Sequence, residues 1–188
     1  MIEFFQYLNS LHPLSPEAAN DLMKVIRAKE LRRGQVWLQE GVVCDKMTFV
    51  VKGLLKLYFE TGSKEVVVNF AKGNELMISA QSYFEQSPSR YIIRSVEQTV
   101  VIYIMRNDIQ NLLEKHHQLH LHLLLIAQRQ IADLEYHTGL LMLSRKERFE
   151  KLKADKIWMI DRRMLSDKML AGYLGMTANC LCGFKKTG

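Results

Sequence analysis

Between residues 36 and 105, the chain alternates short apolar runs with glycines or polar turns, a pattern typical of β-strands. The runs are rich in β-branched and aromatic residues. Six strands are expected, at residues 36–39, 47–52, 54–60, 65–71, 91–96 and 99–105. Gly53 stands between two of these strands and is expected in a tight hairpin, because glycine tolerates a positive φ. Turns that recur roughly every 8 to 15 residues predict an antiparallel sandwich or barrel.

Helical patterns flank the strands. Residues 17–28 are expected to form a helix that begins at Ser15-Pro16, since proline is favoured at the first helical position. The segment 74–88 interrupts the strand pattern and is expected to hold a short helix and a loop. The sequence therefore predicts a β-domain with a helical lead-in.

A much longer helix is expected from a cap at Asn107-Asp108 to about Leu143. One face carries a mostly apolar seam with spacings of four and three, as in coiled coils. The seam consists of His120, Leu124, Ala127, Ile131, Leu134, Thr138 and Leu141. A helix of about 35 residues would span roughly 50 Å, more than a small barrel can cover. Self-association through part of this helix is favoured over simple docking on the β-domain.

The last region, residues 144–188, begins with a second amphipathic helix over residues 144–155, with Phe149 and Leu152 on its inner side. A pattern typical of a helix-turn-helix follows over residues 167–186. Ala171 is small where two helices would cross, and Gly175 lies where the turn needs a positive φ. Apolar residues occupy the positions that would fill the core between the helices, namely Leu170, Leu174, Met176, Leu181 and Phe184.

Several polar residues of this unit are candidates for binding DNA. Ser166 and Thr177 can cap the first and second helices. The second helix would place its first residues in the major groove, here Thr177, Ala178, Asn179 and Cys180. Asn179 is the best candidate for reading a base, because a carboxamide bonds bidentately to adenine. The basic residues expected on phosphates are Arg162, Arg163, Lys168, Lys185 and Lys186.

Charge is distributed unevenly along the chain. Residues 1–144 hold 15 basic and 15 acidic residues, whereas residues 145–188 hold 11 basic and 5 acidic residues. The net charge of +6 therefore lies entirely in the last 44 residues. A neutral body with a basic end favours a polyanion partner at that end, although a solvated basic surface is the alternative.

The order of a glycine-punctuated β-domain, a long helix and the terminal LSDKMLAGYLGMT unit resembles the Crp/Fnr family of bacterial transcription regulators. Residues 32–59 resemble the first half of that family's cyclic nucleotide-binding β-roll, and residues 106–113 resemble the start of its dimerisation helix. The resemblance implies an α+β chain with a β-roll sensor at residues 1–106, a dimerisation helix at 107–143 and a helix-turn-helix domain at 144–188. It further implies a homodimer whose sensor domain places two DNA-reading helices on double-stranded DNA.

Members of the family that bind cyclic nucleotides carry adjacent Gly-Glu and a later Arg-Ser/Thr-Ala. Here the first element reads Gly73-Asn74-Glu75 and the second reads Ser89-Arg90-Tyr91. A shift of one residue in a strand turns a side chain to the opposite face. Glu75, Ser89 and Arg90 remain the candidate ligand residues, but a cyclic nucleotide is disfavoured. Another small-molecule effector, or none, stays open.

The recognition helix also departs from the family, which usually shows Glu-Thr and then Ser-Arg. This chain has Asn179-Cys180 and Cys182-Gly183, and a glycine inside a helix costs about 1 kcal/mol relative to alanine. The chain also stops two residues after the unit, so a shortened C-terminus is one expectation. The alternative function is a cyclic nucleotide-domain-like sensor or scaffold with a degenerate, weakly DNA-binding helix-turn-helix.

Other classes are disfavoured. A cupin-type enzyme holds its metal with strand histidines, and no histidine lies between residues 36 and 105. His116, His117, His120 and His122 cluster, and His116 with His120 would share a helix face, but a metal site is not favoured. Cys44, Cys180 and Cys182 are too few for a disulfide framework. The sequence predicts a cytoplasmic protein that is not an enzyme, with no cofactor and no signal peptide or membrane partner.

Overall fold

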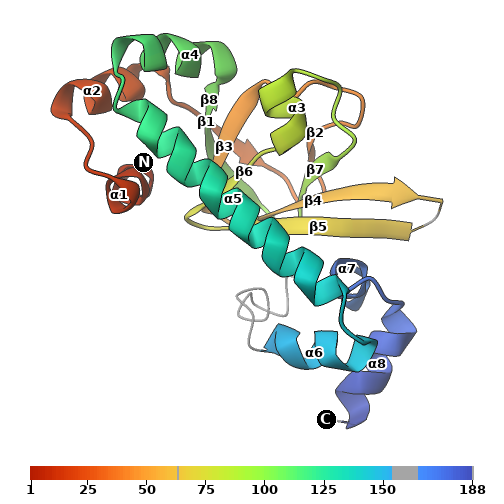
Figure 1. The fold of residues 1–188 in the computed structure, drawn as a ribbon. Helices are drawn as coiled ribbons and strands as arrows, with labels where there is room; N and C mark the ends of the chain where they lie inside the picture. Colours follow the sequence, from red (N-terminus) through yellow and green to blue (C-terminus); the bar gives the residue numbers. More distant parts are fainter. Residues whose placement is uncertain (63, 154–164, 188) are drawn as a thin grey trace.

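The computed structural model describes residues 1–62, 64–153 and 165–187. Its strands form two four-stranded antiparallel sheets that face each other as a roll (Figure 1). One sheet has the order β1 (Arg27–Leu31), β8 (Thr99–Met105), β3 (Lys46–Lys52), β6 (Glu75–Met77). The other has the order β2 (Val36–Leu38), β7 (Ile92–Ser95), β4 (Leu54–Thr61), β5 (Lys64–Lys72). The predicted antiparallel β-domain is confirmed.

All six predicted strands are present, with small differences at their ends, and two further strands were not predicted. β1 has the sequence RAKEL, and its first four residues are exposed. It therefore lacks the apolar run from which the other strands were predicted. It is an edge strand that β8 holds, with Arg27 opposite Tyr103. The helix expected to reach Ala28 therefore ends earlier, and β6 adds a strand inside the segment expected to hold only a helix and a loop.

The positive φ predicted at Gly53 is confirmed, but the tight hairpin is wrong, because β3 and β4 lie in different sheets and do not pair. The role of this glycine is steric as well as conformational. Gly53 has φ +98°, and a Cβ there would lie 2.6 Å from Thr99 Oγ1 and 2.7 Å from the Gln98 carbonyl oxygen. Thr99 Oγ1 in turn donates to the Leu54 carbonyl oxygen at 3.2 Å. The β3–β4 turn therefore needs glycine because it packs directly against the start of β8.

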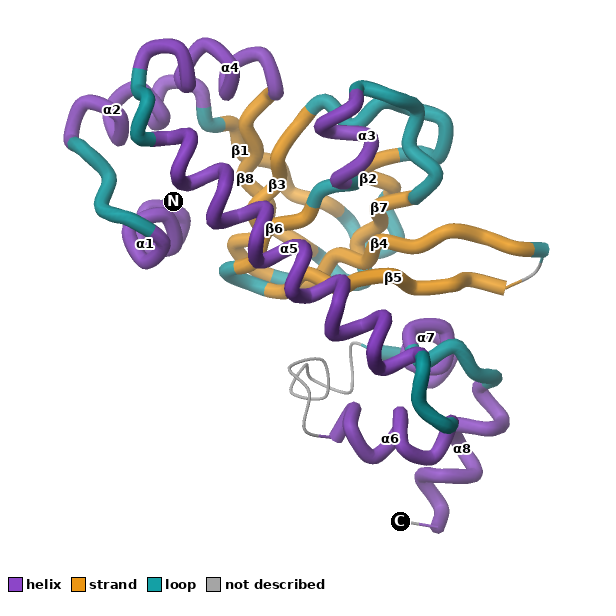
Figure 2. Tube along the Cα trace, in the orientation of Figure 1, coloured by secondary structure: helices purple, strands orange, loops and turns teal. Residues whose placement is uncertain are grey.

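The described helices lie around the roll and below it (Figures 1 and 2). The helices are α1 (Ile2–Leu11), α2 (Pro16–Val25), α3 (Ala80–Glu85), α4 (Arg106–Lys115), α5 (Leu119–Leu141), α6 (Arg145–Lys153), α7 (Asp167–Tyr173) and α8 (Ala178–Thr187). Ser15 caps α2 as expected, because its side chain accepts a hydrogen bond from the Ala18 amide at 3.2 Å. In the described part of the chain, no helix combines the length and apolar character that a membrane crossing requires.

The single helix expected over residues 107–143 is wrong, because the chain breaks between α4 and α5. α4 begins at Arg106 without a side-chain cap, so the predicted Asn107-Asp108 cap is also wrong. His116 leaves the helical conformation with φ −127° and ψ 84°, and its ring bonds Asp21 of α2 at 2.9 Å. That contact lies 95 residues away in sequence, so local pattern could not predict the break. α5 alone has 23 residues and spans about 35 Å.

Candidate DNA-binding unit and ligand pocket

Both helices of the predicted helix-turn-helix begin at a capping side chain. Ser166 Oγ accepts from the Met169 amide at 3.3 Å, at the start of α7. Thr177 Oγ1 accepts from the Cys180 amide at 3.3 Å, at the start of α8. Each bond satisfies an amide that the first helical turn leaves unpaired. The two predicted caps are therefore confirmed.

The turn between the helices depends on Gly175, whose φ is +62°. The Met176 amide closes the turn by donating to the Ala171 carbonyl oxygen at 3.0 Å. Arg148 of α6 supports it, with hydrogen bonds of 2.9 Å to the carbonyl oxygens of Leu143 and Leu174. In the sequence analysis, Arg148 was only one of the basic residues that give the last region its positive charge. In the structure, its guanidinium donates to backbone carbonyl groups at the C-terminal ends of α5 and α7.

A small core holds α6, α7 and α8 together. Leu174 and Leu181 are fully buried, and Leu170 and Ala171 are nearly so. The predicted inner residues of α6, Phe149 and Leu152, are buried in the same cluster. Met176 and Phe184 pack against it from its edge. The positions predicted to be apolar for steric reasons thus form the core between the helices.

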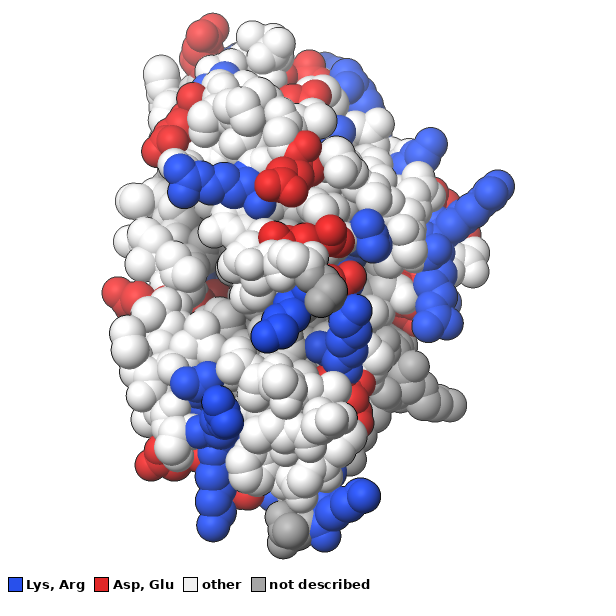
Figure 3. Space-filling view, turned by 90° about the vertical axis from the view of Figure 1, so that its right-hand side faces the viewer, with Lys and Arg blue, Asp and Glu red and all other residues white. Residues whose placement is uncertain are grey.

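The residues expected to read or neutralise DNA have different exposures. Thr177 and Asn179 at the start of α8 are exposed, and Ala178 is half-buried between them. Lys168 and Lys186 are exposed as well. Arg162 and Arg163 lie outside the described residues. On the face shown in Figure 3, the basic side chains are separated by uncharged surface instead of forming one continuous patch.

One predicted phosphate contact, Lys185, is already engaged within the unit. Its ammonium forms a salt bridge with the carboxylate of Asp167, the first residue of α7. The Cys182 thiol donates to the same carboxylate at 3.3 Å. This hydrogen bond, together with burial, raises the pKa of the Cys182 thiol. A local acid therefore already pairs with one of the basic side chains that were expected on phosphates.

The seam predicted for dimerisation is solvent-facing along α5. Leu124, Ile131 and Leu134 are 54%, 57% and 56% exposed. Ala127 and Leu141 are half-buried, and His120 and Thr138 are exposed. Large apolar side chains in a row on one helix face are costly in water, so this surface is a candidate for covering by another chain.

The histidine cluster is divided between separate contacts. His116 ends α4 and bonds Asp21, whereas His120 lies on α5, so the expected shared helix face is wrong. His122 is buried and bonds the carbonyl oxygen of His12 at 2.9 Å. Within the described residues, no three His, Cys, Asp or Glu side chains are grouped as a metal ion would need.

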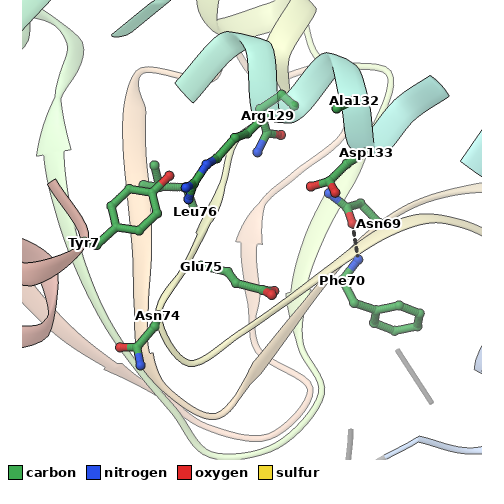
Figure 4. A pocket seen from close by; sticks show the side chains of 10 residues that line it. Tyr7, Asn69, Phe70, Asn74, Glu75, Leu76, Arg129, Ala132 and Asp133 are labelled. Atoms are coloured by element: carbon green, nitrogen blue, oxygen red, sulfur yellow. Dashed lines mark hydrogen bonds between the residues drawn. The ribbon is translucent and has the colours of Figure 1, made fainter. Parts of the chain in front are cut away.

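A pocket of about 340 Å³ lies between α5 and the β5–β6 edge of the roll, within the range of small-molecule sites (Figure 4). It is bounded by α1, β5, β6 and α5. The lining residues are Tyr7, Asn69, Phe70, Asn74, Glu75, Leu76, Arg129, Gln130, Ala132 and Asp133. Most of these were not predicted, because the pocket joins four elements that are distant in sequence.

The polar groups of the pocket come from opposite walls. The Arg129 guanidinium lies 5.6 Å from the centre of the Tyr7 ring. Burial raises the pKa of the Tyr7 hydroxyl, and the positive charge of Arg129 partly opposes that rise. In Figure 4 the Glu75 side chain extends across the floor of the pocket. Its carboxylate accepts a hydrogen bond from the Lys72 amide at 3.0 Å. The pocket can therefore offer hydrogen bonds and charges of both signs.

The three predicted ligand residues are not brought together. Glu75 lines the pocket. Among the described residues that line this pocket, neither Ser89 nor Arg90 is found. Ser89 is buried and contacts the Ser79 hydroxyl at 2.9 Å. Arg90 is exposed on the loop before β7.

Comparison with known proteins assigns the roll to a domain class. Residues 28–116 match the family model of the cyclic nucleotide-binding domain. This part of the chain, from β1 to the residue after α4, is therefore similar to a cyclic nucleotide-binding domain. No curated protein sequence matches the chain.

Solved structures share the fold over most of the chain at low sequence identity. FixK2 from Bradyrhizobium japonicum matches with a TM-score of 0.74 and 16% identity, over 87% of this chain and 84% of its own. CLP from Xanthomonas campestris, a c-di-GMP responsive global regulator, matches with a TM-score of 0.71 and 14% identity, over 92% and 91%. A CooA mutant from Carboxydothermus hydrogenoformans matches with a TM-score of 0.68 and 16% identity, over 89% and 79%. The resemblance to Crp/Fnr regulators is confirmed in the domain and in the fold.

Proposed function

We propose that this protein is a DNA-binding transcription regulator of Crp/Fnr type that acts as a homodimer in the cytoplasm. The observation that carries the proposal is the capped α7–turn–α8 unit, which leaves Thr177 and Asn179 exposed at the start of its second helix. Helix-turn-helix proteins read the major groove with that part of the second helix. The shared fold with CLP, a c-di-GMP responsive global regulator, supports the same role. No catalytic activity is proposed.

The exposed seam of α5 supports the homodimer. Leu124 and Ile131 are one heptad apart, and Leu134 lies three residues further on the same side. Two copies of α5 would cover these side chains and present two α8 helices about a two-fold axis. Such a dimer addresses palindromic half-sites about one turn of DNA apart.

The pocket beside α5 supports a small-molecule effector. It joins the roll to the helix that carries the seam, so a ligand there would favour one relative placement of the two DNA-binding units. A cyclic nucleotide remains disfavoured for two reasons. Arg90 lies apart from the pocket, and the described lining of the pocket includes the carboxyl groups of Glu75 and Asp133. The candidate effector is a small polar molecule that carries less negative charge than a phosphodiester.

Two observations favour the alternative, a sensor whose helix-turn-helix binds DNA weakly. Lys185 is paired with Asp167, which gives α8 one fewer available cation for phosphates. A Cβ added at Gly183 in α8 would meet nothing within 4 Å, so packing does not require glycine in this helix. Glycine there lowers the stability of α8 without a steric reason. Weak, salt-sensitive retention without sequence preference would favour this alternative.

The deciding experiment is selection of the purified full-length protein on a random duplex library at two salt concentrations, followed by sequencing of the retained DNA. The proposed function predicts an enriched palindrome at both concentrations. Retention that disappears with salt and enriches no sequence would reject it, since phosphate contacts alone are salt-dependent and carry no sequence information.

Asn179→Ala tests the base-reading assignment. We expect the affinity for the selected operator to fall by ~1–3 kcal/mol through one base pair, whose preference is then lost. The matched control is Lys186→Ala, which should weaken all sequences about equally and reduce the salt slope by about 1. Unchanged preference at every position in the Asn179→Ala selection would remove Asn179 from the reading surface.

Ile131→Glu tests the dimer seam. A carboxylate in the centre of a paired apolar seam should weaken association by about 2 kcal/mol or more, roughly thirtyfold in the dissociation constant. Sedimentation should then show monomer at micromolar concentration. Gln128→Glu, on the neighbouring exposed position, is the control and should leave the dimer intact. Parent protein that is already monomeric at that concentration would refute the homodimer.

A further inference from the structure

The helix-turn-helix unit shares a buried cluster with the outer face of the β2-β7-β4-β5 sheet. From the sheet, this cluster includes Leu54, Tyr58 and Phe70. From the DNA-binding unit, it includes Leu170 and Tyr173 of α7. Figure 1 shows α7 directly beneath β4 and β5. The contact is therefore a packed interface and not a loose tether between two domains.

Gly172 lets α7 approach the sheet at backbone distance. A Cβ on Gly172 would lie 2.6 Å from the Glu65 carbonyl oxygen and 3.5 Å from the Val67 side chain, both in β5. The third of the three nearest atoms is the Val67 amide nitrogen at 3.6 Å, so all three belong to the roll. Glycine at this helical position serves the docking and not the helix-turn-helix, where alanine would be the better helix former.

Tyr173 joins the docked helix to β5 and α5, two of the elements that bound the pocket. Its ring stacks on His137 of α5, with centroids 4.1 Å apart and an interplanar angle of 12°. His137 Nε2 donates to the Tyr173 carbonyl oxygen at 2.8 Å. On the other side, the ring lies 5.8 Å from Phe70 of β5. Phe70 also lines the pocket, and His137 lies one helical turn after Asp133, another lining residue.

Polar groups lie beneath this interface. Lys56 is 2% exposed, forms a salt bridge with Glu65 and lies 4.2 Å from the centre of the Tyr58 ring. Among the described residues, Tyr58 Oη and Arg94 Nε are buried side-chain atoms without a hydrogen-bond partner. Tyr58 belongs to the cluster that α7 shares, so burial of its unpaired hydroxyl opposes docking.

We propose that α7 is a releasable latch, held on the outer face of the β2-β7-β4-β5 sheet by the Gly172 approach and the Tyr173 stack. The closed latch fixes the direction of α8 relative to the roll. The unpaired Tyr58 hydroxyl offsets part of the gain from packing, which keeps the closed and open states close in free energy. Because Phe70 and His137 connect the latch to the pocket walls, a change in the pocket reaches α7 through direct contacts.

The test is amide hydrogen exchange of the full-length protein, measured peptide by peptide on three variants. Gly172→Ala brings a Cβ onto the Glu65 carbonyl oxygen and should open the latch, which speeds exchange in β5 and α7 on the order of tenfold. Tyr58→Phe removes the unpaired hydroxyl and should slow exchange there severalfold. Gly183→Ala in α8 adds the same methyl group in open space and should leave β5 unchanged.

The pattern across peptides separates an open latch from an unfolded domain. An open latch leaves α6 and α8 as protected as in the parent, because the contacts of α8 with α6 and α7 move together with the unit. Unchanged exchange in β5 and α7 of Gly172→Ala, faster exchange in α8 to the same degree, or faster exchange in Tyr58→Phe would each overturn the proposal. The experiment uses no DNA, so its result is independent of the proposed function.

Discussion

The buried cluster inside the roll differs from the cluster between the roll and the DNA-binding unit in the polar groups that each contains. Inside the roll, Phe49 and Val101 pack with apolar neighbours, and the nearby buried serines are satisfied. Ser82, for example, donates to the Ser87 carbonyl oxygen at 2.6 Å and accepts from the Cys44 amide at 2.8 Å. The second cluster contains Tyr58, whose hydroxyl is unpaired, and Lys56 lies over the Tyr58 ring with its charge paired.

This difference indicates different roles for the two clusters. An apolar core with satisfied polar atoms favours one permanent arrangement. An interface that buries an ion pair and unpaired atoms has a smaller net stability, because desolvation offsets part of the gain from packing. The roll is therefore a fixed scaffold, and the second cluster has the composition of an interface that can open.

The largest expected effect comes from Phe49→Ala in the first cluster. Phe49 is 1% exposed and contacts the rings of Phe4 and Tyr7, with centroids 5.3 Å and 5.5 Å away. Its truncation should lower the free energy of unfolding by ~3–5 kcal/mol in urea titrations followed by circular dichroism. Phe84→Ala, at a 49% exposed position, is the control and should cost less than about 1 kcal/mol. Equal costs at both positions would contradict the assignment of Phe49 to the scaffold core.

Gly175→Val is expected to have an intermediate effect, confined to the DNA-binding unit. A β-branched residue at φ +62° is strained by about 2 kcal/mol, and its side chain would crowd Arg148 and Leu141. Thermal unfolding should show loss of the helix-turn-helix before the roll, and retention on the operator should disappear. Gly183→Ala is the control and should keep both. A single unfolding transition at the parent temperature would show that the turn needs no positive φ.

The smallest effect is expected from Asp167→Asn, which separates charge from packing at the α7–α8 contact. The ion pair with Lys185 is partly exposed, so stability should change by no more than about 0.5 kcal/mol. The Cys182 thiol loses the carboxylate that raises its pKa, so alkylation near pH 8 should become severalfold faster in a Cys180→Ser background. DNA retention should rise slightly as Lys185 becomes available. An unchanged alkylation rate would mean that Asp167 does not control this thiol.

The sequence alone determined the local features of both regions. Short runs of β-branched and aromatic residues between glycines or polar turns predicted the six main strands. Steric rules at Ala171 and Gly175, with caps at Ser166 and Thr177, predicted the helix-turn-helix. These signals are local, because side-chain periodicity and positive φ depend only on nearby residues. The same local reasoning could not find β1, whose exposed charged residues become a strand only because β8 pairs with them.

Tertiary structure alone decided the break after α4, the pocket beside α5 and the docking of α7. The contact of His116 with Asp21 joins residues 95 positions apart, and the pocket draws on α1, β5, β6 and α5. Nothing in the sequence around Gly172 indicates that this helical position needs glycine. The reason is the Glu65 carbonyl oxygen, more than a hundred residues earlier, which leaves no room for a Cβ. Such contacts depend on which surfaces meet after folding, and surface complementarity between distant elements leaves no periodic signal along the chain.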